Sequence, residues 1–222
     1  MAKNKLERFR DIEEFPNVFE YTDFRNDDDK PKGKWHSQIF KNRNPIVLEL
    51  ACGKGEYTRA LAEMYPGKNF TGIDIKGARI WKGAKDALEK NKQNIHFLRM
   101  YIDHLDEYFA PREVSEIWIT FPDPYPRKGK ASKRLTSPKF LNIYSKVIKP
   151  GGLIHLKTDS DLLFNFTRMT IKSTGCQLVD LVENVYKERP DDKLLTIQTF
   201  YEKQHLSQRK TIKYVCFRLG QL

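Results

Sequence analysis

Residues 46–56 have the sequence IVLELACGKGE, a short apolar run followed by a loop with two glycines. Such a run is typical of a buried strand, and residues 57–65 after the loop have the apolar spacing of a helix. In a doubly wound sheet, a strand, a glycine loop and a helix in this order form a unit that binds ligands beyond the carboxyl ends of the strands. The stretch therefore predicts an α/β fold with a ligand site at this loop.

Strands and helices continue to alternate after this unit. We expect strands at 46–50, 70–75, 95–100, 116–120 and 153–158, and helices at 57–65, 78–90, 103–109, 138–148 and 162–173. This alternation implies a Rossmann-like, mostly parallel sheet with helices on both faces. Two further strands are expected at 177–185 and 211–218. We expect the last strand to close the edge of the sheet as an antiparallel member.

Length and composition favour a single core. A chain of 222 residues with 39% hydrophobic content can bury one sizeable core, and its length favours one domain over two. Residues 1–44 are polar and interrupted, so we expect an N-terminal arm there that is mobile or loosely docked. The folded domain is then expected at 45–222.

Cysteine spacing and hydropathy favour a cytoplasmic protein. Cys52, Cys176 and Cys216 lie far apart, without the close pairs of a zinc site or a small disulfide-rich domain. No apolar run approaches the roughly 20 residues that a membrane-spanning helix needs, and the first residues lack the apolar stretch of a signal peptide. We expect no bound metal and no membrane contact.

The positive charge of the chain is concentrated in one stretch. The formal net charge is +11, and residues 124–157 contain nine Lys or Arg and no Asp or Glu. Lys and Arg gain affinity for a polyanion by releasing its condensed counterions, so a nucleic acid is the expected partner. The alternative is a basic surface that only keeps the protein soluble.

The glycine loop predicts a nucleoside cofactor. Asp74 ends the second strand 21 residues after Gly53, a spacing at which a carboxylate can bind both hydroxyls of a ribose. Gly53 and Gly55 allow a ligand to approach the backbone. Thr58 replaces the last glycine of a dinucleotide fingerprint, and Glu49 would repel a pyrophosphate, whereas it favours the cationic S-adenosylmethionine. The alternative is that the two glycines only form a tight turn.

Three further carboxylates follow strands that should end at the same edge of the sheet. Asp103 follows the third strand and could bind an adenine amino group, or cap a short helix. Asp123 lies between two prolines that restrict its turn, and could act on a substrate or only cap that turn. Asp159 ends the fifth strand and could contact substrate or cap the next helix.

A basic strip follows the Asp123 turn directly. It consists of Arg127, Lys128, Lys130, Lys133 and Arg134. Its position beside the expected ligand edge favours RNA binding, and the alternative is a solvated loop.

Together these segments resemble the bacterial tRNA (guanine-N7)-methyltransferases, from about Lys34 to the end of the sequence. The matching segments are 49–55, 72–74 (GID), 121–124 (FPDP), the basic strip ending in KRLT at 133–136, 151–152 with 155–159, and 199–202 (TFYE). The FPDP turn with its basic tail is the discriminating feature. The resemblance implies a class I methyltransferase domain at 45–222, with a seven-stranded sheet whose final hairpin includes one antiparallel strand.

The resemblance also implies the reaction and the roles of individual residues. The reaction is methyl transfer from S-adenosylmethionine to guanine 46 of tRNA. Glu49, Asp74 and Asp103 contact the cofactor, and Asp123 serves both cofactor and base. The substrate is held by Arg127, Asp159, Thr199, Phe200, Tyr201 and Glu202. The chain departs from the family pattern at Ala51, which is usually glycine, and at Tyr125 and Arg127, where tryptophan and lysine are frequent.

Guanine N7 is an unprotonated acceptor, so its methylation requires no general base. Catalysis should come from holding the reactants in line and from stabilising, with Asp123, the positive charge that passes to the purine. Three other functions remain open: a methyltransferase acting on another RNA, one acting on a protein or small molecule, and a non-catalytic RNA-binding protein. The sequence leaves open a monomer or a homodimer.

Overall fold

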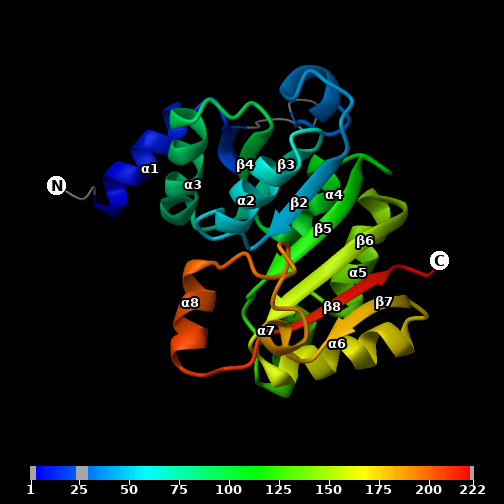
Figure 1. Ribbon diagram of the computed structural model, residues 1–222. Helices are drawn as coiled ribbons and strands as arrows, with labels where there is room; N and C mark the ends of the chain where they lie inside the picture. Colours follow the sequence, from blue (N-terminus) through cyan, green and yellow to red (C-terminus); the bar gives the residue numbers. More distant parts are fainter. Residues whose placement is uncertain (1–3, 24–29, 221–222) are drawn as a thin grey trace.

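The computed structural model describes residues 4–23 and 30–220, which form one eight-stranded sheet in the order β1-β4-β3-β2-β5-β6-β8-β7 (Figure 1). The strands are β1 (Val18–Glu20), β2 (Ile46–Leu50), β3 (Asn69–Asp74), β4 (Ile95–Arg99), β5 (Val114–Thr120), β6 (Ile148–Thr158), β7 (Gln177–Val182) and β8 (Lys213–Arg218). The α-helices are α1 (Lys5–Glu14), α2 (Glu56–Met64), α3 (Gly77–Glu89), α4 (Leu105–Tyr108), α5 (Pro138–Val147), α6 (Asp161–Ser173), α7 (Val185–Glu188) and α8 (Phe200–Ser207). The predicted α/β fold with a mostly parallel sheet is confirmed.

The predicted strand number of seven is wrong, because the segment expected to be an arm supplies an edge strand. Val18 of β1 pairs in parallel with Phe97 of β4. Helix α1 packs beside α3 (Figure 1). Farther along, the fully buried Trp35 stacks on Phe109 at 4.8 Å and donates its indole N–H to the Tyr108 carbonyl at 2.8 Å. A three-residue strand is too short to show periodicity, which is why the sequence pattern missed it.

The last strand lies inside the sheet. β8 is antiparallel to β6 on one side and to β7 on the other, so β7 forms the edge. The antiparallel orientation expected of the last strand is therefore confirmed, and its expected place at the edge of the sheet is wrong. The final hairpin with one antiparallel strand, which the resemblance implied, is confirmed by the pairing of β7 with β8.

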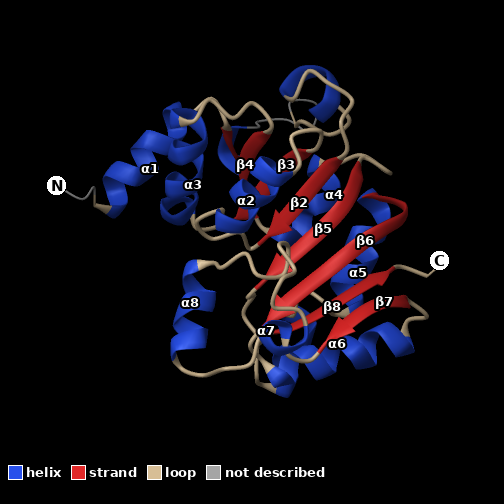
Figure 2. Ribbon diagram, in the orientation of Figure 1, coloured by secondary structure: helices blue, strands red, loops and turns tan. Residues whose placement is uncertain are grey.

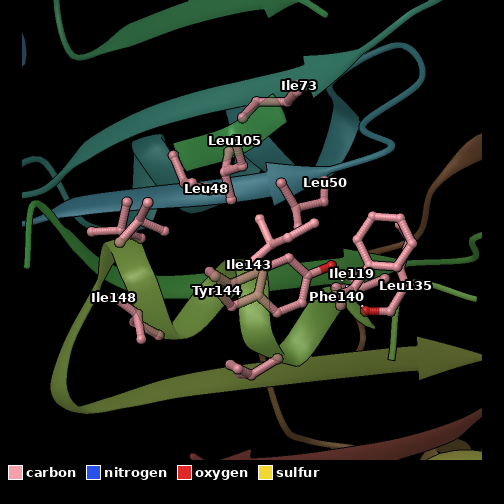
Figure 3. Packing of buried hydrophobic residues seen from close by; sticks show 14 of the residues in the cluster. Leu48, Leu50, Ile73, Leu105, Ile119, Leu135, Phe140, Ile143, Tyr144 and Ile148 are labelled. Carbon is pink, nitrogen blue, oxygen red and sulfur yellow. Dashed lines mark hydrogen bonds between the residues drawn. The ribbon is translucent and has the colours of Figure 1, made fainter. Parts of the chain in front are cut away.

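Helices cover both faces of the sheet (Figure 2). Alternation along β2 sends Leu48 and Leu50 to one face and Val47 to the other. Figure 3 shows the first of these clusters, in which the β2 leucines lie beside α5. Its labelled side chains are Leu48, Leu50, Ile73, Leu105, Ile119, Leu135, Phe140, Ile143, Tyr144 and Ile148. The two buried layers fix the strand ends, and thus the loops that follow them.

None of the helices in the described ranges is both long and apolar enough to cross a membrane.

Candidate active site

A cleft of about 1110 Å³ opens beyond the carboxyl ends of β2 to β6. The loops after these strands and helix α8 contribute its walls. The predicted site residues that line the cleft are Gly53, Asp74, Asp103, Asp123, Lys133, Asp159, Thr199 and Tyr201. Those that do not line it are Glu49, Gly55, Arg127, Lys128, Lys130, Arg134, Phe200 and Glu202. The predicted residues thus divide into a group at the cleft and a group around or beneath it.

The loop after β2 is tied to Asp74 at the end of β3. Asp74 Oδ2 accepts the Gly53 N–H at 2.9 Å, and Oδ1 accepts the Lys76 N–H at 2.8 Å. These bonds fix the carboxylate, whose remaining lone pairs can accept hydroxyl donors. A Cβ placed on Gly53 would meet no atom within 4 Å, so the backbone there faces open space. This arrangement fits a nucleoside ligand lying along the loop.

Gly55 serves packing beneath the cleft. It precedes α2 with a φ of 62°. A Cβ there would lie 2.5 Å from the Phe97 ring of β4, which is closer than van der Waals contact allows. Ala51, where the family usually has glycine, also has a left-handed φ of 58°. A side chain in that conformation is strained by about 1 to 2 kcal/mol.

Glu49 lies under the glycine loop and supports it. Its Oε2 accepts the Thr58 N–H at 2.8 Å and also the Thr58 hydroxyl, and its Oε1 accepts the Thr120 hydroxyl at 2.7 Å. Burial raises the pKa of Glu49 to about 7. The side chain therefore joins the start of α2 to the end of β5. In the structure it supports the loop, and its contact with the cofactor, which the resemblance implied, stays a prediction.

Asp103 and Asp159 both reach the cleft, and neither caps a helix. Asp103 forms an ion pair with Lys139 of α5, and α4 begins after His104. Asp159 Oδ2 accepts the Lys210 Nζ–H at 2.8 Å. The cap of α6 is Ser160. The capping alternatives for Asp103 and Asp159 are therefore wrong.

The turn after β5 presents Asp123 to the cleft. Phe121 and Tyr125 on either side have left-handed φ values of 50° and 42°, a conformation that persists only where the surroundings enforce it. Arg134 does so by donating Nε–H to the Pro124 carbonyl at 3.0 Å and Nη2–H to the Tyr125 carbonyl at 2.9 Å. The Asp123 carboxylate is exposed, and it has no hydrogen-bond or ion-pair partner within the described residues.

The basic strip is divided by burial. Arg127, Lys128, Lys130 and Lys133 are exposed, the last three in a 3₁₀ helix (Lys128–Lys133). Arg134 is only 7% exposed and its guanidinium lies over the Phe166 ring at 4.4 Å. Arg134 therefore holds the Asp123 turn, and the structure does not place it on the surface predicted to bind RNA.

The start of α8 is anchored in the interior. Thr199 Oγ1 accepts the Glu202 N–H at 3.2 Å and caps the helix. Glu202 has no exposed surface, and its carboxylate forms an ion pair of 2.7 Å with the equally buried Lys157. Tyr186 donates its hydroxyl to the same carboxylate at 2.9 Å. Burial raises the pKa of Glu202 and lowers that of Lys157. Glu202 thus lies out of reach of a ligand in the cleft.

Several cleft residues were not predicted from the sequence, and they come from α8 and the residues after it, from the loops after β2 and β3, and from α3 and α5. His205 of α8 stacks against Phe121 with ring centroids 5.6 Å apart, and its Nδ1 lies 3.4 Å from Asp159. Other unpredicted lining residues are Lys54, Lys76, Arg79, Lys139 and Lys210. Apart from the family-like segment at 199–202, the sequence signal for the wall that α8 contributes was helix-forming composition between 185 and 211.

In the described part of the chain, no three His, Cys, Asp or Glu side chains converge in a way that could hold a metal ion. Cys52, Cys176 and Cys216 are free thiols.

Comparison with known proteins agrees with this geometry. A family model described as "Putative methyltransferase" matches residues 43–215. Among solved structures, the 16S rRNA methyltransferase KamB has a TM-score of 0.65 at 16% identity, covering 83% of this chain and 92% of its own. A Haemonchus contortus phosphoethanolamine N-methyltransferase in complex with S-adenosyl-L-methionine has a TM-score of 0.52 at 11% identity, covering 85% of this chain and 53% of its own. At these identities the likeness shows a class I methyltransferase fold.

The sequence relatives are closer and cover nearly the whole chain. A tRNA (guanine-N(7)-)-methyltransferase of Bacteroides fragilis is 48% identical, over 100% of this chain and 88% of its own. One from Christiangramia forsetii is 47% identical, over 98% of this chain and 99% of its own. Another, from Clostridioides difficile, is 34% identical, over 86% of this chain and 88% of its own. By identity and coverage, this chain belongs to the tRNA (guanine-N(7)-)-methyltransferase family.

Proposed function

We propose that this protein transfers the methyl group of S-adenosylmethionine to N7 of guanine 46 in tRNA and so forms 7-methylguanosine. The observation that carries the proposal is the position of Asp123. Its unpartnered carboxylate lines the same cleft as Asp74 and the glycine loop. A nucleoside ligand and a nucleic acid base can therefore meet in front of one negative charge.

The cofactor half of the cleft fits S-adenosylmethionine. The open space at Gly53 would accommodate a ligand along the backbone, and Asp74, which also accepts the Gly53 N–H, would accept the two ribose hydroxyls. Asp103 lines the same cleft and would accept the adenine amino group. Glu49 and Gly55 keep this loop in shape from below. When bound, the cofactor supplies an electrophilic methyl group on a sulfonium.

The part of the cleft that receives guanine would promote methyl transfer by holding the base in line and by stabilising positive charge. Guanine N7 uses its lone pair for the new bond to carbon, and the purine takes up the positive charge that leaves the sulfur. The bond between sulfur and the methyl carbon would break as the new bond forms, and Asp123 would stabilise the charge that develops on the purine. No proton has to move, because N7 carries none. Asp159, Arg127 and residues 199–201 hold the base and its nucleotide. Lys128, Lys130 and Lys133 bind phosphates of the tRNA.

The proposal also covers the location, oligomeric state and metal requirement of the enzyme. We place the protein in the cytoplasm, acting on tRNA as a monomer or homodimer and without a metal ion. Three free cysteines and the methyl-transfer chemistry are compatible with that setting.

Mapping a labelled methyl group tests the proposal directly. The purified protein is incubated with methyl-labelled S-adenosylmethionine and an unmodified tRNA transcript, and the label is located after digestion to nucleosides. We expect 7-methylguanosine at position 46 and no label in a matched transcript with adenine at that position. Label on another nucleotide, or only on another RNA, would keep the methyltransferase and refute this target. Cofactor binding without label on any RNA would refute RNA methylation.

A further inference from the structure

We propose that Tyr101 packs against the nucleobase of S-adenosylmethionine and that Tyr21, which follows the extra strand β1, holds the Tyr101 ring in place. The N-terminal segment from α1 to Tyr21 is then part of the cofactor site. The inference deepens the proposed function, on which it rests for the orientation of the cofactor with its adenine toward Asp103. The family resemblance implied no role for this segment, which precedes Lys34.

Tyr21 and Tyr101 lie at the edge of the sheet where ligands bind. Strand β1 runs parallel to β4, with Glu20 opposite Arg99. Tyr21 follows β1 directly, and Tyr101 follows Met100 just after β4. In parallel sheets the ligand lies beyond the carboxyl ends of the strands, so the eighth strand brings one more segment to that edge.

A side cavity joins Tyr21 to the cleft. It has a volume of about 190 Å³, and its lining residues are Tyr21, Met100, Tyr101, His104, Glu107 and Tyr108. Met100 and Tyr101 also line the main cleft, as does Asp103. The side cavity therefore adjoins the end of the cleft where the adenine of the cofactor is expected.

The two tyrosine rings form an exposed aromatic pair. Their centroids are 6.2 Å apart, and their planes are inclined at 51°. Tyr21 is 39% exposed and Tyr101 is 56% exposed. A nucleobase covers such a ring by stacking, because every base has a π-face. Tyr101 is the ring that adenine would reach, since it lines the cleft, and Tyr21 lies behind it.

The polar groups of the side cavity bind one another. Glu107 accepts a hydrogen bond from Lys30 Nζ at 2.6 Å, and His104 Nδ1 lies 2.6 Å from the same carboxylate. The Lys30 ammonium also lies 5.3 Å from the centroid of the Tyr108 ring. A lysine of the chain thus already takes the position that a cationic ligand would occupy. A flat, neutral group such as adenine fits the exposed rings instead.

Arg99 connects the Tyr21 segment to the loop after Asp74. Its Nη1–H donates to Glu20 at 2.7 Å, and its guanidinium lies 5.6 Å from the centroid of the Tyr21 ring. Its Nε–H donates to the Ile75 carbonyl at 3.2 Å. Ile75 follows Asp74, the expected ribose ligand, and itself lines the cleft. Tyr21 is therefore fixed relative to the cofactor site.

Helix α1 packs against the same part of the chain. A Cβ on Gly77, the first residue of α3, would lie 2.7 Å from Ile12 and 2.8 Å from Phe9 of α1. The missing side chain of Gly77 lets the two helices approach closely. The N-terminal segment is thus docked on both strands whose loops would hold the cofactor nucleoside, through β4 and through the residues after β3.

The affinity for S-adenosylhomocysteine, the demethylated cofactor, tests the inference. It is measured by calorimetry without RNA, after circular dichroism has shown that each variant is folded. We expect Y101A to weaken binding about fivefold or more, because it removes the stacking surface. Y21A should weaken binding about threefold or more, because the Tyr101 ring loses its support. Y101F and Y21F keep the rings and should bind within about twofold of the unmodified protein.

A double variant tests whether Tyr21 acts through Tyr101. In Y21A/Y101A the affinity should lie within about twofold of that in Y101A alone. Losses that multiply, or an effect of Y101A without one of Y21A, would overturn the positioning role of Tyr21. The matched control is L6A, which removes a 69% exposed side chain from the same segment, away from the cleft. It should leave the affinity within about twofold.

Filter binding of tRNA separates the cofactor from RNA as the partner of the rings. We expect tRNA affinity to stay within about twofold in the single variants, because the rings face the cofactor end of the cleft. A loss of tRNA affinity with unchanged cofactor affinity would overturn the inference and assign the rings to RNA. Unchanged cofactor affinity in both Y101A and Y21A would also overturn it.

Failure of the inference is distinguishable from failure of the proposed function. The first appears as unaltered S-adenosylhomocysteine affinity in variants of a protein that methylates guanine 46. The second appears in the unmodified protein, as methyl label on a different nucleotide or RNA, whatever the cofactor affinity of the variants.

Discussion

The turn at 121–125 and the start of α8 at 199–202 both carry an acidic residue that the family resemblance linked to the substrate. The two carboxylates nevertheless differ in exposure and in hydrogen-bond partners. Asp123 is exposed at the cleft and has no partner among the described residues. Glu202 has no exposed surface and is bound by Lys157 and Tyr186. The difference shows that a charged motif residue can serve the site either by facing the ligand or by holding the residues that do.

One residue connects the two regions. The carbonyl of Lys157 accepts the Phe121 N–H at 2.8 Å, while its Nζ donates to Glu202 at 2.9 Å and to the Ile197 carbonyl at 2.9 Å. The Asp123 turn and helix α8 are therefore both hydrogen-bonded to one residue of β6, Lys157. Changes at Glu202 should act on stability and changes at Asp123 on chemistry.

Of these variants, removal of the Glu202 carboxylate should lower the free energy of unfolding most. E202A leaves the Lys157 ammonium buried without its carboxylate, which costs about 3 to 5 kcal/mol of unfolding free energy. Urea denaturation followed by circular dichroism measures this loss. The control is E183A, whose carboxylate is 66% exposed in a surface pair with Arg168 and should matter by less than about 1 kcal/mol. Equal stabilities of the two variants would contradict the supporting role of Glu202.

Removal of Asp123 should affect turnover instead. D123A loses the charge that stabilises the transition state, and we expect kcat to fall about 10²- to 10³-fold by analogy with other single electrostatic groups. The tRNA dissociation constant and the urea midpoint should remain near those of the unmodified protein. D191A, which removes an exposed aspartate away from the cleft, serves as the control. Normal turnover in D123A would remove this residue from the mechanism.

His96 of β4 is a half-buried titratable group, and its buried Nδ1 has no hydrogen-bond partner in the described residues. Burial lowers its pKa from 6.5 to about 4. Between these values the unfolded chain binds more protons than the folded one, so stability decreases as pH falls through this window. The change should be roughly 2 to 3 kcal/mol, at 1.36 kcal/mol per pKa unit.

Urea midpoints at pH 7 and pH 4.5 test the His96 prediction. In H96F the same pH change should cost clearly less stability than in the unmodified protein, because the titrating group is gone. An identical pH dependence in both proteins would assign the acid sensitivity to other groups.

The smallest expected effects distinguish exposed from buried cations within the basic strip. K130A should weaken tRNA binding a few-fold and lower the salt slope by about one, because it removes one phosphate contact. R134A should leave the salt slope unchanged and lower the urea midpoint, because it frees the Pro124 and Tyr125 carbonyls. Filter binding at several salt concentrations measures the slopes. A lower salt slope in R134A would show that Arg134 contacts the RNA, contrary to this prediction.

Sequence patterns predicted the parts of the molecule that depend on local periodicity. The unit from β2 to α2 and the placement of Asp74 and Asp123 at one edge follow from apolar spacing and parallel topology. The strand Val18–Glu20 was missed because three residues are too few to show a periodic apolar pattern. The roles of Glu49 and Arg134 were also missed, since charge and spacing do not show which side chains turn inward to hydrogen-bond a loop.

The position of α8 could not be predicted from the sequence for a different reason. This helix begins more than a hundred positions after the glycine loop, and it has hardly any one-sided apolar pattern to reveal its orientation. The ion pair of Glu202 with Lys157 and the hydrogen bond from the Phe200 N–H to Glu56 hold its first turn in place.

The position of β8 between β6 and β7 has a consequence for synthesis on the ribosome. Chains emerge from the N-terminus onward, so β7 appears before β8, the strand with which it pairs. Until β8 arrives, β6 and β7 each expose an unpaired edge, which is a template for aggregation. Helix α8 lies just before β8 in the sequence and is tethered by it. A nascent chain stalled before β8 would therefore be a substrate for chaperones before it could be a catalyst.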